Sequence, residues 1–274
     1  DNLVPLDVAL IQCTPPDEHG YCSLGVSVDV VSSAIKSAKT VVAQFNPLMP
    51  RTLGDTFIPV SAIDYFMEAS QPLPELDYSG TTPETDQVAK RIGEYVAQLV
   101  EDGSTLQIGL GRIPNAVCAA LQTHQHLGIH SEMVSDGVMA LMQCGAVDNS
   151  RKVSYPGKTV TAFAAGSQEL YRFVHDNPGF SFQPTELVND PMVIGRNRNV
   201  VAINTAIEVD ITGQVVSDSI GDQFFSGIGG QVDFLRGAAL SPGGFGIIAL
   251  PSTTHCGRTS RIVATPASGA GIVA

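Results

Sequence analysis

The sequence predicts an α/β fold with parallel strand pairing, and three observations indicate it. Short apolar runs alternate with segments of helical periodicity along most of the 274 residues, which is typical of strand–helix–strand units. A stretch of prolines and small polar residues, 70–83, separates two such segments. Hydrophobic residues make up 43% of the chain and charged residues only 15%, so a chain of this length can bury a sizeable core.

The first segment, residues 1–80, is expected to hold one strand–helix–strand unit. The apolar run that ends at Cys13 predicts a buried strand, and residues 14–25 (TPPDEHGYCSLG) predict a loop. Residues 28–38 have a helical pattern, and residues 40–45 predict the next strand. This order predicts that the two strands pair in parallel.

The second segment, residues 81–274, opens with the strongest helical pattern of the chain. Its apolar positions recur at three- and four-residue spacing from Val88 to Leu99. Thr82 or Thr85 could cap the start of this helix, and Gly103 would end it. Further strands are expected over 105–111, 127–133, 160–166, 200–210 and 245–253, and further helices over 113–121 and 135–145.

The composition argues against several classes of protein. A formal net charge of -12 argues against a general nucleic-acid binder, which needs clustered lysines and arginines. The sequence contains no run of about 18 apolar residues, so no membrane span is expected. The first residues lack the pattern of a signal peptide. The five cysteines are odd in number and lack CxxC spacing, so we expect reduced thiols in a cytoplasmic protein.

One glycine-containing turn is a candidate for binding phosphate. Residues 109–115 (GLGRIPN) lie between a predicted strand and a predicted helix, where backbone N–H groups can bind an anion. The same residues could equally form an ordinary tight turn, and they lack the third glycine of a dinucleotide fingerprint. Any of the few cations of this segment could also meet phosphate, although such residues usually form a solvated surface: Arg112, Lys158, Arg258 and Arg261.

Two further features are candidates for acyl chemistry. Residues 226–234 (SGIGGQVDF) contain a dense glycine cluster, which suits an oxyanion hole but is as well explained by a packed turn. Glu132 follows an apolar strand, and residues at the carboxyl ends of parallel strands face the ligand crevice of open α/β sheets. A carboxylate there can act as nucleophile or base; without a partner it would be a rim acid with no role.

The histidines near Glu132 do not predict a metal site. His130 and Glu132 form the H-x-E pair of zinc deaminases, but the P-C-x-x-C partner is missing. His124, His126 and His130 are close in sequence, yet no further ligands follow at metal-binding spacing. We therefore expect no metal site.

Six stretches occur in an order that resembles one known family. They are TPPDEHGYCSLG, QIGLGRIPNAV, LGIHSEMVSDG, LVNDPMVIG, VAINTAIEVDITGQV and FSGIGGQVDFLRGA. The chain is similar over essentially its whole length to the acetyl-CoA hydrolase/transferase family of class I CoA-transferases. The resemblance implies two open α/β domains of the CoA-transferase type, the first only partly present. Residues 1–80 would be the C-terminal part of the first domain, and residues 81–274 the second domain, incomplete at its C-terminus.

The resemblance also implies which residues form the site. Glu132, in GIHSEM, matches the catalytic glutamate. Gly230, beside Gly229, matches a position whose backbone N–H faces the reacting carbonyl, and Asn189 matches an asparagine of the active site. The residues implied to contact CoA or substrate are Ile108, Gly109, Gly111, Asn189 and Gly227.

The activity implied is transfer of CoA from an acyl-CoA to a small carboxylate by ping-pong chemistry through a glutamyl-CoA thioester. 4-Hydroxybutyrate, butyrate and acetate are the expected carboxylates. CoA would be a substrate, no permanently bound cofactor or metal is expected, and the protein would be a homo-oligomer. The alternatives are an acetyl-CoA hydrolase that uses the same intermediate, a non-catalytic CoA-binding domain, and a Rossmann dehydrogenase.

Overall fold

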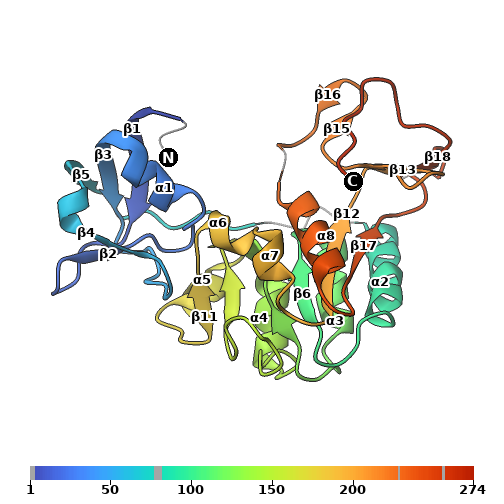
Figure 1. The fold of residues 1–274 in the computed structure, drawn as a ribbon, viewed down its shortest axis with the longest axis horizontal. Helices are drawn as coiled ribbons and strands as arrows, with labels where there is room; N and C mark the ends of the chain where they lie inside the picture. The colour runs from blue at the N-terminus through green and yellow to red at the C-terminus, as the bar shows by residue number, and fades with distance from the viewer. Residues whose placement is uncertain (1–3, 77–81, 228, 255–256) are drawn as a thin grey trace.

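The computed structural model describes residues 4–76, 82–227, 229–254 and 257–274. Figure 1 shows a small sheet formed by the first residues on one side, a larger sheet between helices at the centre, and an arm of short strands above it. The predicted α/β class is confirmed, because both sheets contain parallel strands joined through helices.

The first unit contains a parallel sheet in the order β1-β3-β5. Its strands are β1 (Leu6–Cys13), β3 (Ala38–Phe45) and β5 (Tyr65–Glu68), with α1 (Val31–Ser37) between the first two. An antiparallel pair and one turn of 3-10 helix complete the unit: β2 (Tyr21–Ser23), β4 (Phe57–Pro59) and Val60–Ala62. The predicted parallel pairing of β1 with β3 is confirmed.

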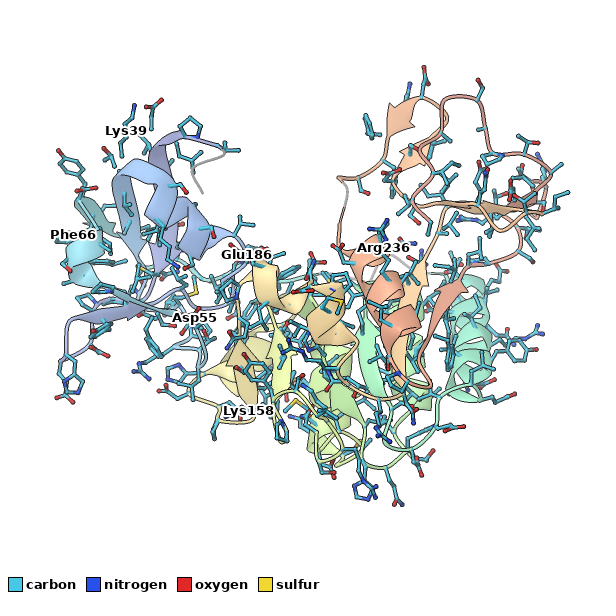
Figure 2. All side chains as sticks on the ribbon, in the orientation of Figure 1. Lys39, Asp55, Phe66, Lys158, Glu186 and Arg236 are labelled. Atoms are coloured by element: carbon cyan, nitrogen blue, oxygen red, sulfur yellow. The ribbon has the colours of Figure 1, made fainter. Side chains whose placement is uncertain are left out.

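The prediction that β1 is a buried strand was only half right. Ala9 and Ile11 are buried, whereas Val8 and Leu10 are 51% and 80% exposed. Successive side chains of a strand point to opposite faces, and only one face of this sheet packs against the rest of the described chain. Phe66 on β5 is also exposed, at the outer edge of the unit (Figure 2).

The larger sheet is parallel throughout, in the order β17-β12-β6-β7. These strands are β17 (Phe245–Ala249), β12 (Val200–Thr205), β6 (Thr105–Ile108) and β7 (Gly128–Ile129). A parallel bridge between His130 and Val160 extends the sheet to β9 (Thr159–Thr161), which pairs with β11 (Phe180–Phe182).

Helices cover both faces of this sheet, as the alternation along β12 requires. Val201 and Ile203 join a core with residues of α2 (Pro83–Ala97), α3 (Arg112–Ala120) and α4 (Asp136–Gln143). Val200 and Ala202 point the other way, into a core with residues of α6 (Thr185–Val188), α7 (Pro191–Ile194) and α8 (Gln231–Leu240). Burial of both faces explains the continuous apolar run of this strand.

The remaining elements are short. β8 (Met133–Val134) pairs in parallel with β10 (Phe163–Ala164), and α5 (Gln168–Val174) follows. The arm contains β13 (Glu208–Asp210), β14 (Val215–Val216), β15 (Ser219–Ile220), β16 (Gln223–Phe224) and β18 (Ile262–Val263) (Figure 1).

Both threonines that were candidates to cap α2 take part in its capping. Thr82 Oγ1 accepts from the Thr85 backbone N–H at 3.3 Å, and Thr85 Oγ1 accepts from the Thr82 N–H at 3.1 Å. Pro83 follows the cap at the first helical position, where its missing N–H costs least. α2 ends at Ala97, before Gly103 with φ +82°.

The proline-rich stretch lies between the two sheets, and residues 77–81 of it are outside the described residues. Residues 71–76 form neither helix nor strand, as predicted. They are nevertheless anchored, because Leu73 is buried beside Met49 and Tyr171, and the Tyr171 hydroxyl donates to the Pro74 carbonyl at 2.7 Å. In the described part of the chain, no helix is long and apolar enough to span a membrane.

Candidate active site

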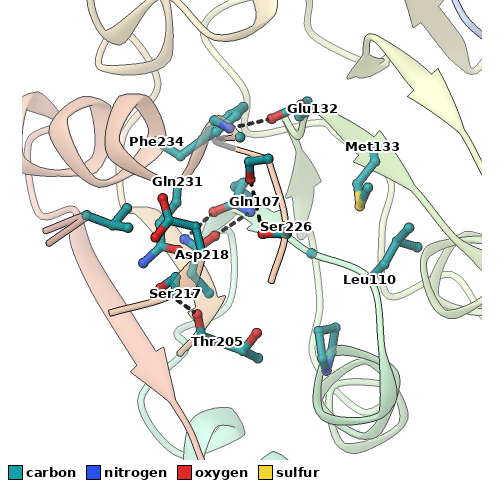
Figure 3. Close-up of a pocket in the computed structure, with 17 residues that line it drawn as sticks. Gln107, Leu110, Glu132, Met133, Thr205, Ser217, Asp218, Ser226, Gln231 and Phe234 are labelled. Carbon is teal, nitrogen blue, oxygen red and sulfur yellow. Dashed lines mark hydrogen bonds between the residues drawn. The ribbon is translucent and has the colours of Figure 1, made fainter. Parts of the chain in front are cut away.

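A cavity lies where the direction of the large sheet reverses. From β6 the chain runs outward through β7, β9 and β11, then returns to β12 beside β6 and continues to β17. In open α/β sheets, ligands bind at such a switch point, beyond the carboxyl ends of the strands. The cavity of about 440 Å³ is lined there by Gln107 and Gly109 at the end of β6, and by Asn204 and Thr205 at the end of β12 (Figure 3).

Glu132 lines the same cavity from the bend between β7 and β8. The predicted strand over 127–133 is therefore shorter than expected, with only a single bridge at His130 before the bend. The half-buried carboxylate is held through one oxygen. Oε2 accepts from the Gly230 backbone N–H at 3.0 Å and from Asn189 Nδ2 at 3.2 Å. Among the described residues, no hydrogen bond reaches Oε1.

Gly230 stands at the start of α8, so part of the expected loop over 226–234 is in fact the first turn of that helix. A Cβ atom at this position would collide with Glu132 Oε2 and Asn189 Nδ2. Its φ of -76° is open to any residue, so lack of space rather than backbone conformation demands glycine. The positive end of the α8 dipole also faces the carboxylate.

Asn189 ends α6, and its backbone N–H donates to the Thr185 carbonyl at 2.9 Å. Asp190 then caps α7, accepting from the Met192 N–H at 2.7 Å. The turn between the two short helices is fixed at both sides. The side-chain amide of Asn189 is thereby directed at Glu132.

The other residues predicted for the site fall into two groups. Gly109, Gly227 and Gly229 line the cavity with Glu132 and Gly230. Ile108 and Gly111 do not, because Ile108 is buried in the core and Gly111 is the N-cap of α3, where φ of +121° favours glycine. Their proposed contact with CoA stays a prediction.

Sequence reasoning missed three polar groups of the site. Gln107 and Asn204, on neighbouring strands, exchange hydrogen bonds, with Asn204 Nδ2 donating to Gln107 Oε1 at 2.9 Å. Asp218 is buried in the cavity wall, and its Oδ1 has no partner among the described residues. A polar residue inside an apolar strand, as in LQIG and AINT, was the available signal for the first two.

A buried serine joins Glu132 to the sheet. Ser131 Oγ donates to the Ile108 carbonyl at 3.0 Å and accepts from the Ile108 N–H at 3.3 Å. Ser131 is thus hydrogen-bonded to both backbone groups of Ile108 on β6, and this anchors the bend that carries Glu132 to the sheet.

The histidines do not gather around a metal. His124 contacts the Val100 carbonyl, His126 pairs with Asp148, and His130 contacts the Val188 carbonyl at 2.9 Å. Across the described residues, no group of three or more His, Cys, Asp or Glu side chains is arranged to hold a metal ion. Cys13, Cys22, Cys118 and Cys144 are free thiols, and Cys256 lies outside the described residues.

A buried lysine and His130 lie behind the site. Lys152 Nζ donates to the carbonyls of Ile129 and Lys158 at 2.7 and 2.6 Å, and burial lowers its pKa to about 7. Burial, and then the nearby Lys152 charge, lower the pKa of His130 to about 4. The imidazole is therefore neutral at physiological pH.

A second cavity, of about 660 Å³, lies on the other side of the 109–114 turn. Its charged lining residues are Arg112, Arg261 and, in the first turn of α2, Glu84. Arg112 donates to Thr85 Oγ1 at 2.9 Å, and Arg261 donates to the Ile207 carbonyl at 3.3 Å. Two cations therefore meet at this cavity.

Comparison with known proteins agrees with this architecture. Residues 1–74 match the family model described as the acetyl-CoA hydrolase/transferase N-terminal domain, and residues 166–274 match the model of its C-terminal domain. The chain belongs to the acetyl-CoA hydrolase/transferase family. Members of this family use CoA as a substrate, and the resemblance seen in the sequence is confirmed.

Two curated relatives and one solved structure illustrate the similarity. The chain is 52% identical to the 4-hydroxybutyrate coenzyme A transferase of Clostridium kluyveri, over 99% of this chain and 62% of that protein. It is 48% identical to the succinyl-CoA:cyclohexane-1-carboxylate CoA transferase of Geobacter metallireducens, over 98% and 60%. The chain thus spans about three fifths of the length of these relatives.

The fold matches the crystal structure of 4-hydroxybutyrate CoA-transferase from Porphyromonas gingivalis. The TM-score is 0.86 at 41% sequence identity, covering 97% of this chain and 64% of that one. The predicted fold of the CoA-transferase type is therefore confirmed, with the N-terminal domain of the family only partly present.

Proposed function

We propose that the full-length protein containing this chain transfers CoA from an acyl-CoA to a small carboxylate, with Glu132 as nucleophile. One observation carries the proposal. A half-buried carboxylate faces the cavity at the switch point and is held through a single oxygen by two donors. The similarity to CoA-transferases from other organisms supports it.

In the first half of the reaction, a Glu132 carboxylate oxygen attacks the thioester carbonyl. The C–S bond breaks, giving an acyl-glutamyl anhydride and CoA thiolate. The thiolate then attacks the glutamyl carbonyl, releases the first carboxylate and leaves a glutamyl-CoA thioester. In the second half, another carboxylate attacks the glutamyl thioester, the C–S bond breaks, and a second anhydride and CoA thiolate form. The thiolate then attacks the carbonyl of the new acyl group, which gives the new acyl-CoA and restores the Glu132 carboxylate. This is covalent, ping-pong catalysis.

The two donors to Glu132 Oε2 stabilise negative charge in the steps in which the glutamyl carbonyl is attacked. Because Gly230 N–H and Asn189 Nδ2 both contact Oε2, Oε1 is left as the attacking oxygen. Oε2 becomes the carbonyl oxygen of the anhydride and of the glutamyl thioester. When thiolate or carboxylate attacks that carbonyl, negative charge develops on Oε2, where the two donors already lie.

The second cavity suits the nucleotide end of CoA. CoA carries phosphate groups at one end and the thioester at the other, and Arg112 and Arg261 lie across the 109–114 turn from Glu132. We place the phosphates against these arginines and the pantetheine arm along Gly109. The proposed chemistry draws on CoA as substrate and on Glu132, and calls for no permanently bound cofactor or metal.

The cavity beside Glu132 favours particular acyl groups. Among the described residues that line it, the ionisable side chains are the acids Glu132 and Asp218, and none is Lys or Arg. An acyl chain that ends in a methyl or hydroxyl group fits such a lining better than one that ends in a second carboxylate. 4-Hydroxybutyrate, butyrate and acetate remain the proposed carboxylates.

A cytoplasmic homo-oligomer remains the expected form of the protein.

A hydrolase would use the same glutamyl intermediate and pass it to water. The family description names both activities, so the distinction depends on the acceptor. If butyryl-CoA consumption by the full-length protein requires added acetate, the protein is a transferase; equal consumption without acetate identifies a hydrolase. Binding of butyryl-CoA without turnover in either condition identifies a non-catalytic domain.

The decisive experiment traps the intermediate. The full-length protein is incubated with butyryl-CoA and no acceptor, its intact mass is recorded, and any adduct is mapped by peptide analysis. We expect a CoA adduct on the peptide that contains Glu132, and none in a Glu132→Gln control. An adduct at another residue would exclude Glu132 as the nucleophile. The absence of any adduct would also exclude it if no free CoA is released, because hydrolysis of the intermediate would release CoA.

A further inference from the structure

One buried side chain outside the reaction contacts the supports of both donors to Glu132. His130 Nε2 lies 2.9 Å from the carbonyl of Val188, the residue immediately before Asn189. The same ring meets Phe234 of α8 edge-on, with centroids 6.4 Å apart. Phe234 in turn lies under Gly230, where a Cβ atom would come within 3.2 Å of its ring.

The imidazole is confined to one tautomer. A carbonyl oxygen only accepts hydrogen bonds, so Nε2 carries the proton and donates it to Val188. Nδ1 is buried and has no hydrogen-bond partner among the described residues. Burial and then the charge of nearby Lys152 lower the pKa of the ring and oppose a second proton. The ring therefore acts as a neutral donor that is fixed in place on the core side.

We propose that His130 is a positioning residue for the CoA-transfer reaction: its Nε2–H fixes the Val188–Asn189 turn, so that the Asn189 amide stays on Glu132 Oε2. This role rests on the proposed function. His130 does not line the cavity, so it acts through Asn189 and not on the substrate.

The test compares His130→Gln and His130→Asn in the full-length protein, because their side-chain amides differ in length by one methylene. The side-chain nitrogen of glutamine can occupy the place of imidazole Nε2 and donate to Val188, whereas the amide of asparagine falls one methylene short. We expect His130→Gln to keep kcat within about threefold of the wild type, and His130→Asn to lower it about tenfold or more with KM for butyryl-CoA changed less than about twofold. Thermal unfolding of both variants accounts for any loss of fold.

A double variant separates positioning from general destabilisation. If His130 acts through Asn189, His130→Asn in an Asn189→Ala background lowers kcat less than about twofold further. Losses that multiply in the double variant, or equal losses in the Gln and Asn variants, would overturn the positioning role while leaving the transferase intact. A wild-type protein that fails to transfer CoA would instead overturn the proposed function, and the role of His130 with it.

Discussion

At the scale of single residues, the site depends on the hydrogen bond from the Gly230 N–H to Glu132, which leaves no room for a side chain at position 230. Gly230 brings its N–H to 3.0 Å from Glu132 Oε2, and a Cβ at that position would displace the carboxylate. The colliding atoms include the far ends of two flexible side chains, Glu132 and Asn189. An added methyl group should therefore disturb the site much more than the fold.

The Gly230→Ala variant tests this point. We expect kcat to fall by about 10²-fold, the size of effect that follows removal of one donor to a developing oxyanion. The melting temperature should change by only a few degrees, because the flexible ends of Glu132 and Asn189 can move aside. Steady-state kinetics and a thermal melt of the full-length protein measure both quantities. Wild-type turnover in a folded variant would contradict the proposed geometry.

Glu132 itself can be tested by changes of charge and of length. Glu132→Ala and Glu132→Gln remove the attacking oxyanion, so transfer should fall to the background of the assay. Glu132→Asp keeps the charge but retracts the carboxylate by one methylene, and we expect a loss of about 10²-fold. Initial rates with butyryl-CoA and acetate provide the measurement. Near-normal turnover in the glutamine variant would exclude Glu132 as nucleophile.

At the scale of elements, the turn from β6 into α3 separates two cavities of different chemistry. Gly109 lines the cavity of Glu132, while Arg112, at the start of α3, lines the other with Arg261. Gly111 between them has φ of +121°, which side-chain-bearing residues rarely adopt. The turn thus lies between the cavity that contains Arg112 and Arg261 and the cavity that contains the Glu132 carboxylate.

Removing the cation should weaken binding of CoA without changing the chemistry. We expect Arg112→Ala to raise KM for butyryl-CoA about tenfold with kcat changed less than about twofold, as for a contact made equally in ground and transition states. Arg236→Ala is the matched control, because Arg236 is exposed on α8 and lines neither cavity (Figure 2). Equal KM values for the two variants would show that the phosphates bind elsewhere.

At the scale of the whole molecule, a buried lysine lies in the core beside β7. Lys152 is 4% exposed and, among the described residues, forms no ion pair. Its stem packs on Gly128 of β7, where a Cβ would collide with it, and its ammonium donates to two carbonyls. Burial lowers its pKa from 10.5 to about 7.

This lysine should make stability depend on pH. Its pKa is lower in the folded than in the unfolded chain, so between pH 7 and 10.5 the unfolded chain binds more protons. The free energy of unfolding therefore rises with pH in this window, by up to about 1 kcal/mol per pH unit. Urea unfolding at pH 7 and pH 8.5 should show a steeper rise in the wild type than in Lys152→Met. Parallel slopes in the two proteins would show that Lys152 is charged when folded.

Much of the secondary structure could be predicted because it depends on local patterns. The predicted helices over 113–121 and 135–145 begin within one residue of α3 and α4, and the candidate caps Thr82 and Thr85 bracket the start of α2 at Pro83. Glu132 was found as an acid at the end of a strand, and the ordered motifs indicated the family.

The predictions failed where tertiary packing overrides local sequence. The run before Cys13 looked buried, but Val8 and Leu10 face away from the core. The expected strand over 127–133 is interrupted, because the chain bends after His130 to carry Glu132 over the cavity.

The sequence by itself determined the α/β class, the order of the elements and the carboxylate to examine, since each depends on neighbouring residues. The family resemblance named Asn189 and Gly230 as site residues, but only the tertiary structure decided that both contact one oxygen of that carboxylate. Asn189 and Gly230 lie 57 and 98 residues from Glu132, and sheet order together with the packing of α6 and α8 brings them to one oxygen. Contacts between residues so far apart in the sequence form only when the whole core folds and brings distant segments together. No local sequence pattern encodes such contacts.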